Sequence, residues 1–402
     1  MTVRTAPDRR VAGLDGVRGL AALFVVLHHC FLMSFAGFPV NTGPFWLGWL
    51  LYGHFAVVVF ITLSGFSLAI SPARKGWRLG SKAVFAQRRA WRILPPYWAA
   101  LAFSLVIAWG LGVPQPNSPP PDGRSVFVYG LLVQDIFSAP TPNGAFWSIA
   151  VEAQLYLIFP LLLLLLRRYG VAAVLAAVTV PAIAIGLLAP YASVVDKLTR
   201  FTPQFAPLFA IGLVAAGIVS ASERLRRLPW QWLAALAALP VVIVIAVNGS
   251  VWTVTNLYWI DLAIGPATAL LLAALATRRP APLVWLLGTR PIRSLGTISY
   301  SLYLVHAPIV VAVASKVVAP HFPPGLPMFW VTLAVAAPVS VAFARAFAAF
   351  FEIPFQRYRS WAALRAAVRA RVAGAPKPAQ PAPAQPAPVG ADAALREPVS
   401  EA

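Results

Sequence analysis

Long apolar runs recur along the chain from Val17 to Phe351, separated by short polar connections. A membrane-spanning helix needs about 20 mostly apolar residues. The runs of that length are 17–36, 48–70, 93–112, 146–166, 170–190, 202–220, 230–248, 258–276, 295–318 and 327–351. Only 11% of the residues are charged, whereas a soluble protein has about 25%, so this chain cannot cover a water-facing surface of its length. The sequence therefore predicts an all-α, polytopic membrane helical bundle of about ten transmembrane helices.

The lysines and arginines are divided unevenly between the two sides that such a bundle would have. Of the 32, 28 lie in the N-terminal segment, in the second, fourth, sixth and eighth connections, and in the C-terminal segment. The other connections hold Arg124, Lys197, Arg200 and Lys316. Because basic residues accumulate in the cytoplasmic loops of membrane proteins, both termini are predicted to be cytoplasmic.

The net charge of +20 follows from this topology and does not indicate a nucleic-acid partner, because the basic residues lie in short clusters between apolar runs. Cys30 is the only cysteine, which excludes a disulfide framework and a cysteine-based metal cluster. The sequence has no set of His, Cys and Asp residues with metal-ligand spacing, and no Walker or dinucleotide-binding glycine pattern. We therefore expect no metal.

Residues 1–373 are predicted to form one membrane domain. From about Gly374 the chain is rich in Pro and Ala and lacks the apolar residues that would offset the entropy of ordering, so 374–402 is predicted to be a disordered cytoplasmic tail. The apolar segment 126–139 is too short to span, and is predicted to be a re-entrant or interfacial helix on the outer face. The first run is predicted to be an uncleaved helix, because no small-residue cleavage site clearly follows it.

Ionisable residues inside the predicted spans are costly and therefore indicate function. The candidates are His28, His29, His54, Glu152, Asp261 and His306, with Arg18, Arg89 and Arg92 at the inner boundary. Counted from the outer helix ends at about 1.5 Å per residue, His29 lies about 10 Å deep, and His54 and Glu152 each lie about 9 Å deep. These three residues come from three different helices. The sequence therefore predicts a polar cavity in the outer half of the membrane, lined by two histidines and a carboxylate.

Arg18 and His29 are 11 residues apart, which is about 20° past three full helical turns and about 16 Å along the axis. Both therefore project from one stripe of the first helix, with Arg18 at its cytoplasmic end and His29 in its outer half. This spacing suits a site entered from two sides, with an anionic group held below and a reacting atom brought up to the histidine. The alternative is that Arg18 is a snorkelling anchor and His29 a hydrogen-bonded core residue.

Five segments of the chain form an ordered set of motifs. They are LDGVRGLAALFVVLHHC (14–30), GHFAVVVFITLSGFSLA (53–69), RRAWRILPPYW (88–98), FWSIAVEAQLYLIFPLL (146–162) and LGTISYSLYLVHAPIV (295–310). Together they resemble acyltransferase family 3, the membrane O-acyltransferases that modify bacterial surface glycans and lipids. The resemblance runs over residues 14–355.

Two motifs of that family fall on charged residues of this chain. Arg18 and His29 match its Arg/Lys-x10-His motif, and Arg89 and Arg92 match its RxxR pair. In the fourth segment the family's VEEQ pattern reads VEAQ, which leaves Glu152 as the only carboxylate of that segment.

The resemblance implies a cytoplasmic acyl-CoA donor, with acetyl-CoA the expected one, and an extracytoplasmic glycan or glycolipid acceptor such as a surface polysaccharide or lipopolysaccharide. It places the protein in the bacterial cytoplasmic (inner) membrane, in contact with membrane lipid. Arg18, Arg89 and Arg92 lie at the predicted inner boundary, where they would bind a CoA phosphate through bidentate guanidinium contacts. The alternative for the Arg89 and Arg92 pair is plain positive-inside topology.

Acyl transfer to a hydroxyl needs a base for the hydroxyl proton and donors for the oxyanion. His29 is predicted to be that base, because an imidazole titrates near neutral pH. Glu152 is predicted to orient His29, as the acid does in a Ser-His-Asp triad. The predicted substrate-binding residues are His54, Trp147, Tyr156, Tyr303, His306 and Asp261. For these residues the alternatives are helix packing, an interfacial aromatic belt, a core histidine or an interfacial acid.

The sequence thus predicts a membrane O-acyltransferase that moves a short acyl group, with acetyl expected, from acyl-CoA to an acceptor hydroxyl. One alternative is a secondary transporter, in which the intramembrane His and Glu residues form a proton relay. That alternative lacks support from inverted repeats or helices broken at matching positions. Another alternative is a non-catalytic subunit that translocates acyl groups. The acceptor, the acyl chain, a covalent intermediate and the oligomeric state stay open.

Overall fold

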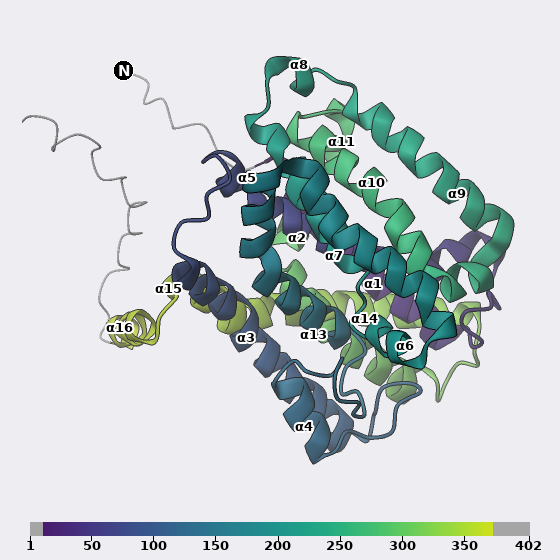
Figure 1. The fold of residues 1–402 in the computed structure, drawn as a ribbon. Coiled ribbons are helices and arrows are strands. Elements are labelled where there is room, and N and C mark those ends of the chain that lie inside the picture. Colours follow the sequence, from purple (N-terminus) through teal and green to yellow (C-terminus); the bar gives the residue numbers. More distant parts are fainter. Residues whose placement is uncertain (1–10, 373–402) are drawn as a thin grey trace, which may run out of the picture. The chain divides into compact units, whose positions relative to one another are not determined.

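The computed structural model describes residues 11–372. The chain divides into two compact units, Met1–Arg357 and Tyr358–Ala402. In the described part of the chain every regular element is a helix (Figure 1), which confirms the all-α prediction. The second unit contributes α16 (Trp361–Val372). The predicted disordered tail 374–402 lies outside the described residues.

The first unit is a bundle of helices, most of them apolar. Its elements are α1 (Leu14–Ser34), η1 (Phe45–Tyr52), α2 (Phe55–Ala73), α3 (Lys82–Leu105), η2 (Val106–Gly110), α4 (Gly123–Gly130), α5 (Phe146–Leu188), η3 (Ala189–Tyr191), α6 (Ser193–Thr199), α7 (Phe205–Ala215), η4 (Ala216–Ser220), α8 (Glu223–Arg226), α9 (Trp230–Thr255), α10 (Leu257–Ala276), α11 (Ala281–Gly288), α12 (Arg290–Thr297), α13 (Ser299–Ala312), η5 (Val313–Val318), α14 (Leu326–Phe347), η6 (Ala348–Glu352) and α15 (Ile353–Tyr358).

Within the described residues, 8 helical segments are long and apolar enough to cross a membrane. They are Leu14–Ser34, Phe45–Ala73, Lys82–Gly110, Phe146–Tyr191, Trp230–Thr255, Leu257–Ala276, Ser299–Val318 and Leu326–Tyr358. A multi-pass helical membrane protein is therefore confirmed. The count of about ten spans and the cytoplasmic placement of both termini stay predictions.

Two regions account for the difference between eight and ten. The predicted spans 146–166 and 170–190 both fall in α5, where Gly170 has φ 84° and ψ −175° and interrupts the helix. Glycine is suited to such a break because it adopts positive φ without a steric penalty. The predicted span 202–220 coincides with the apolar segment Phe205–Ser220, which is shorter than the other candidates.

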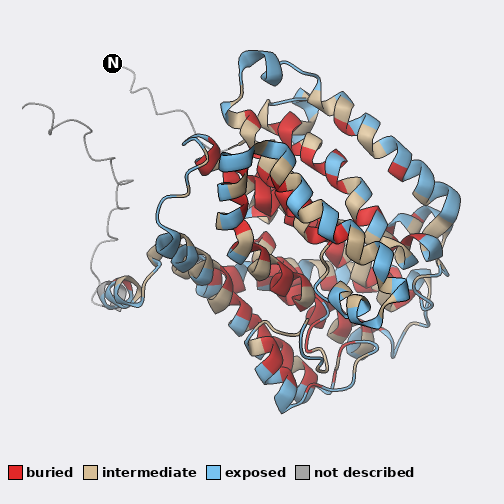
Figure 2. Cartoon of the chain, viewed as in Figure 1, coloured by how far each residue is buried: buried red, intermediate tan, exposed pale blue. Residues whose placement is uncertain are grey.

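The outer helices expose apolar side chains. Leu236, Val242 and Val247 of α9 are all more than half exposed, and most of α9 has the colour of exposed residues (Figure 2). In water an apolar surface of this extent would drive association. Hydrocarbon solvates the same surface, so the exposure agrees with a membrane environment.

α2 and α7 cross at a pair of glycines. A Cβ atom on Gly65 would lie 2.0 Å from the carbonyl oxygen of Phe209, and one on Gly212 would lie 2.0 Å from that of Thr62. Two helices approach this closely only where neither carries a side chain at the contact. Gly65 of the LSGF motif is therefore a packing position, and it fixes the depth and rotation of the residue before it, Ser64.

The predicted short outer segment 126–139 overlaps α4, which has 8 residues and is followed by turns. Asp122 caps this helix: its side chain accepts a hydrogen bond of 2.8 Å from the Ser125 backbone N–H, and that bond holds the pKa of Asp122 below its ordinary value. Beyond the helix, the Asp135 carboxyl accepts a hydrogen bond of 2.8 Å from Gln154 Nε2. Burial nevertheless raises the pKa of Asp135.

Candidate active site

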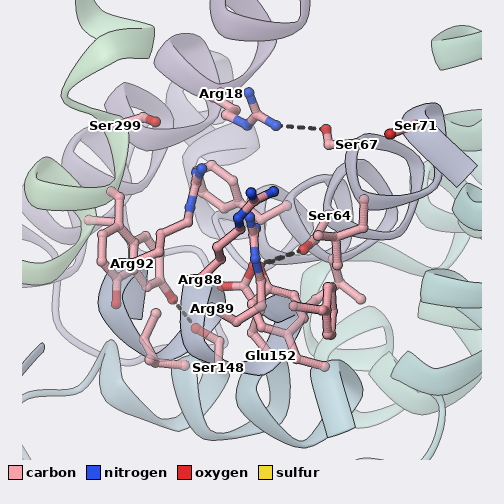
Figure 3. Close-up of a pocket in the computed structure, with 18 of the residues that line it drawn as sticks. Arg18, Ser64, Ser67, Ser71, Arg88, Arg89, Arg92, Ser148, Glu152 and Ser299 are labelled. Atoms are coloured by element: carbon pink, nitrogen blue, oxygen red, sulfur yellow. Dashed lines mark hydrogen bonds between the residues drawn. The ribbon is translucent and has the colours of Figure 1, made fainter. Parts of the chain in front are cut away.

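A cavity of about 520 Å³ lies between α1, α2, α3, α5 and α13 (Figure 3). Its polar lining comprises Arg18, Ser64, Ser67, Ser71, Ser81, Arg88, Arg89, Arg92, Ser148, Glu152, Tyr156, Ser299, Tyr300 and Tyr303. Leu79 and Ser81, in the connection between α2 and α3, also line it. The cavity therefore opens at the C-terminal end of α2, which is the end predicted to face the cytoplasm.

Four arginines line this cavity. Arg88, Arg89 and Arg92 come from the first half of α3, and Arg18 comes from α1. The structure thus brings the three predicted CoA-binding arginines together and adds Arg88. Figure 3 shows the four side chains gathered around one space.

Arg18 differs from the three arginines of α3 because its charge is already compensated. Its Nη1 donates to Asp15 Oδ1 at 3.0 Å, and its Nη2 donates to Ser67 Oγ at 2.7 Å. The described residues give none of the three α3 arginines an ion pair. Arg89 lies instead 5.8 Å from the ring centroid of Tyr156, an arrangement that stabilises a cation without neutralising it. The α3 side of the cavity therefore keeps a positive charge that suits an anionic ligand.

Glu152 lies in the same cavity at the centre of a hydroxyl network. Ser64 Oγ donates to Glu152 Oε1 at 2.8 Å, and the Tyr156 hydroxyl donates to the same oxygen at 2.5 Å. Ser148, Glu152 and Tyr156 are spaced four residues apart, so they share one face of α5. The Ser148 hydroxyl in turn hydrogen-bonds the Tyr303 hydroxyl at 2.7 Å.

His29 lies outside the cavity lining and is oriented by the backbone. Its Nδ1 hydrogen-bonds the carbonyl oxygen of Val25 at 2.9 Å. Its ring packs edge-on against His306, with 4.9 Å between centroids, and His306 packs 5.7 Å from the ring of Tyr303. Because Tyr303 lines the cavity, these rings form a continuous path of contacts from the cavity to His29.

The predicted pairing of Glu152 with His29 is not found among the described residues. The carboxylate is taken by Ser64 and Tyr156, and the Nδ1 of His29 by a main-chain carbonyl. Glu152 and His29 are both candidates for catalysis still, but the carboxylate does not orient the imidazole.

The predicted polar cavity in the outer half, lined by two histidines and a carboxylate, is also wrong. The cavity that contains Glu152 has no histidine among its lining residues and opens at the arginine end. Counting residues from the helix ends gave the three side chains similar depths. It could not give the direction in which each helix turns them, and the three face different neighbours.

His54 has a different partner, Asp261 of α10. Its Nε2 lies 3.0 Å from both carboxylate oxygens, and its ring is stacked on Trp147, with 5.6 Å between centroids and 5° between planes. The predicted substrate-binding residues thus separate into groups. Tyr156 and Tyr303 line the cavity, His306 contacts His29, and a separate cluster joins His54, Trp147 and Asp261.

The sequence did not indicate Arg88, which lines the cavity, or Glu352, which interacts electrostatically with the lining residue Arg92. Arg88 was counted only among the basic residues of its connection. Glu352 is a buried carboxylate that accepts hydrogen bonds from Ser301 Oγ at 2.5 Å and from Gln356 Nε2 at 2.8 Å. It follows directly after the last predicted span, 327–351, and so was not counted as intramembrane. The helix continues through it, and a span longer by one residue would have included it.

Comparison with known proteins identifies the family. A family model described as an acyltransferase domain, that of acyltransferase family 3, matches residues 11–345. The chain belongs to this family. The match covers α1 through most of α14 and so includes every residue of the cavity.

Three relatives show how the similarity is distributed. The Putative peptidoglycan O-acetyltransferase YrhL of Bacillus subtilis (strain 168) is 27% identical over 352 residues, which cover 81% of this chain and 52% of the relative. Nodulation protein 10 of Rhizobium leguminosarum bv. viciae is 26% identical over 228 residues, 50% of this chain and 58% of the relative. Acyltransferase MdmB of Streptomyces mycarofaciens is 34% identical over 167 residues, 40% of this chain and 41% of the relative. The chain therefore spans about half the length of these relatives. No solved structure matches it.

Proposed function

We propose that this protein is a membrane O-acyltransferase that moves a short acyl group, acetyl in the first instance, from cytoplasmic acyl-CoA to a hydroxyl of an extracytoplasmic glycan or glycolipid. Its proposed setting is the bacterial cytoplasmic membrane, with about ten spans and both termini inside. The relative named as a peptidoglycan O-acetyltransferase supports a cell-envelope glycan as the acceptor class. The membership of an acyltransferase family favours this reading over a transporter.

The observation that carries the proposal is the arginine-lined cavity and its contact path to His29. Arg88, Arg89 and Arg92 supply guanidinium groups that have no ion-pair partner among residues 11–372, and phosphate oxygens are good bidentate acceptors for them. An acyl-CoA bound with its phosphates on α3 would direct its thioester toward the inner wall of the cavity. Tyr303 forms part of that wall, and the path to His29 starts there.

The tautomer of His29 suits a general base. With the Nδ1 proton donated to the Val25 carbonyl, the Nε2 atom keeps its lone pair for a proton. In the proposed step the acceptor oxygen bonds to the acyl carbon and its proton passes to Nε2 of His29. The carbon–sulfur bond then breaks, and the proton passes to the leaving thiolate, giving the ester and free CoA.

Glu152 is proposed to act inside the cavity and not on the imidazole. It fixes the hydroxyls of Ser64 and Tyr156, and places one negative charge among the arginines. Each of these hydroxyls has one proton and donates it to Glu152, so the donors for the oxyanion of the thioester must be other groups, such as the guanidinium groups that line the same cavity.

Turnover of acetyl-CoA by the full-length protein in lipid tests the proposal. We expect His29→Ala to lower the release of free CoA about 1000-fold, because loss of a general base costs about 10²–10⁴ in rate. His321→Ala is the matched control, since His321 lies in the turn before α14, away from the cavity. Both variants should retain the monodispersity and melting temperature of the wild type.

Turnover that survives His29→Ala would overturn the role given to the histidine. If the wild-type protein releases no CoA even in envelope membranes that contain acceptor, the acyl-CoA reading itself fails, and substrate uptake would be measured next.

A further inference from the structure

A second polar cluster lies at the N-terminal end of α2, away from the arginines of α3. It consists of His54, Trp147, Gln204 and Asp261, each within five residues of the start of α2, α5, α7 or α10. His54 precedes Ser67, the hydrogen-bond partner of Arg18, by 13 residues, which is about 20 Å along the helix. Val57 and Ser148 also line the cavity, so the cluster lies beside the end of the cavity that is farther from the arginines.

The His54–Asp261 pair fixes the protonation of the imidazole. The carboxylate of Asp261 is completely buried, and since it can only accept, Nε2 of His54 carries the proton that is shared between both carboxylate oxygens at 3.0 Å. Nδ1 therefore carries a lone pair. No residue in the described part of the chain donates a hydrogen bond to it, and 22% of the His54 side chain is exposed.

Aromatic contacts hold this ring in one plane. Trp147 stacks on one face of it, and Phe205 lies 6.0 Å from its centroid. A histidine held by a carboxylate and by two aromatic rings offers its free nitrogen in one fixed direction. A fixed orientation of this kind is expected of a side chain that binds a ligand. A contact that only joins two helices would not require it.

Gln204 supplies a second acceptor beside the same carboxylate. Its side chain contacts Asp261, it is 7% exposed, and its Oε1 atom is buried with no hydrogen-bond partner among the residues that the structure describes. A buried polar atom without a partner is costly and rare. Two unpartnered acceptors, Nδ1 of His54 and Oε1 of Gln204, suit a ligand that brings more than one hydroxyl donor.

We propose that His54, Asp261 and Gln204 form the acceptor site, which binds a carbohydrate through hydroxyls other than the one that is acylated. His54 and Gln204 accept hydrogen bonds from the sugar, and Asp261 is a positioning residue that holds the tautomer of His54. This proposal rests on the proposed function, because it assigns the second substrate of the same reaction.

The test uses the full-length protein in envelope membranes of its own source bacterium, which contain the acceptor. Radiolabelled acetyl-CoA is the probe, and base-labile label in the glycan fraction is the readout. We expect His54→Leu and Gln204→Met each to lower transfer about tenfold, the effect of losing one well-placed hydrogen bond. The KM for acetyl-CoA should stay within about twofold of the wild type, because the arginine cavity is untouched.

His54→Gln is the conservative variant, since its amide can donate to Asp261 and still present an acceptor. We expect it to recover most of the transfer. A merely structural pair differs in its prediction for Gln204→Met, which would then transfer like the wild type, and for His54→Leu, in which only the melting temperature would fall. Wild-type transfer by Gln204→Met would overturn the proposal even if His54→Leu failed to fold.

Different results would contradict the proposed acceptor site and the proposed acyltransferase function. If label enters the glycan fraction, and its entry depends on His29 but not on His54 or Gln204, the proposed acceptor site is contradicted. The proposed acyltransferase function then stands. An absence of label in the wild type, together with no release of CoA, removes both.

Discussion

The two ends of α2 differ in whether the charged side chains around them are paired. At its C-terminal end the arginines of α3 line an open cavity and have no ion pair within the described residues. At its N-terminal end His54 is paired with the buried Asp261 and covered by Trp147. The first arrangement leaves charge for a ligand to neutralise. The second holds its carboxylate in a buried hydrogen bond and leaves hydrogen-bond acceptors for a ligand.

This difference indicates the kind of substrate that each end selects. A cluster of uncompensated guanidinium groups is stabilised by an anion such as a phosphate, whereas acceptor atoms select a neutral ligand with hydroxyl groups. His29 shares α1 with Arg18, about 16 Å away along the helix axis, and contacts His306. The proposed reaction needs this division, since its donor is anionic and its acceptor is a hydroxyl.

The largest effect on substrate binding is expected at the C-terminal end of α2, where the arginines of α3 line the cavity. Arg89→Ala combined with Arg92→Ala should raise the KM for acetyl-CoA about 100-fold, because hydrogen bonds to a charged group contribute about 1.5–3 kcal/mol each. Steady-state release of CoA by the protein in lipid measures this. Added salt should weaken binding by the wild type more than by the double variant, since salt screens exposed charges.

Arg167→Ala with Arg168→Ala is the matched control. These two residues form another basic pair on the side predicted to be cytoplasmic, but they do not line the cavity. If both double variants raised the KM equally, the arginine cavity would be no more than a part of the general positive charge of that side.

A smaller effect, of opposite sign on binding, is expected at Glu152. Glu152→Gln keeps an acceptor for Ser64 and Tyr156 but removes a negative charge from the cavity. The KM for acetyl-CoA should therefore fall about threefold, because repulsion between the carboxylate and the phosphates is lost. The kcat should fall about tenfold, which corresponds to about 1.4 kcal/mol of transition-state stabilisation.

Glu223→Gln is the control for this change, since Glu223 is an exposed residue paired with Arg227. A rise in the KM for acetyl-CoA in Glu152→Gln would contradict the electrostatic reading. It would indicate that the carboxylate positions the donor directly.

The sequence predicted the arginine end better than the histidine end, for a physical reason. Arg89 and Arg92 are three residues apart on one helix, so their common face follows from helix geometry alone. Arg18 could be placed at the same depth from the pattern of basic residues. For these three arginines to meet in one cavity, it was enough that α1 and α3 begin on the same side of the membrane.

The pairing of the histidines depends on long-range contacts that no local pattern carries. His54 and Asp261 are 207 residues apart in sequence, and each was identified singly as a costly intramembrane group. Which carboxylate meets which imidazole is decided by the rotation of α2, α5 and α10 about their axes. Close packing at Gly65 and Gly212 sets part of that rotation. The sequence therefore pointed to each of these groups singly and gave Glu152 a partner that differs from the one in the structure.

The smallest expected effect concerns a carboxyl that belongs to neither end. Asp135 is partly buried and accepts a hydrogen bond from Gln154, and burial raises its pKa above the ordinary value of 3.8. A raised pKa means that the folded state favours the protonated form, so the charged form lowers stability once the pH exceeds that pKa. Asp135→Asn keeps an acceptor for Gln154 and removes the charge. The variant should melt about 1 °C higher than the wild type at pH 7, and the difference should disappear at a pH below the ordinary value of 3.8, where the carboxyl is protonated in the folded and unfolded protein alike. Melting of the protein in detergent at both pH values measures this.

A lower melting temperature for the variant at pH 7 would show that the charge of Asp135 is compensated by a partner such as Arg200, which lies close enough to lower its pKa. Asp135 would then resemble the paired groups at the N-terminal end of α2 and not the uncompensated arginines at the other.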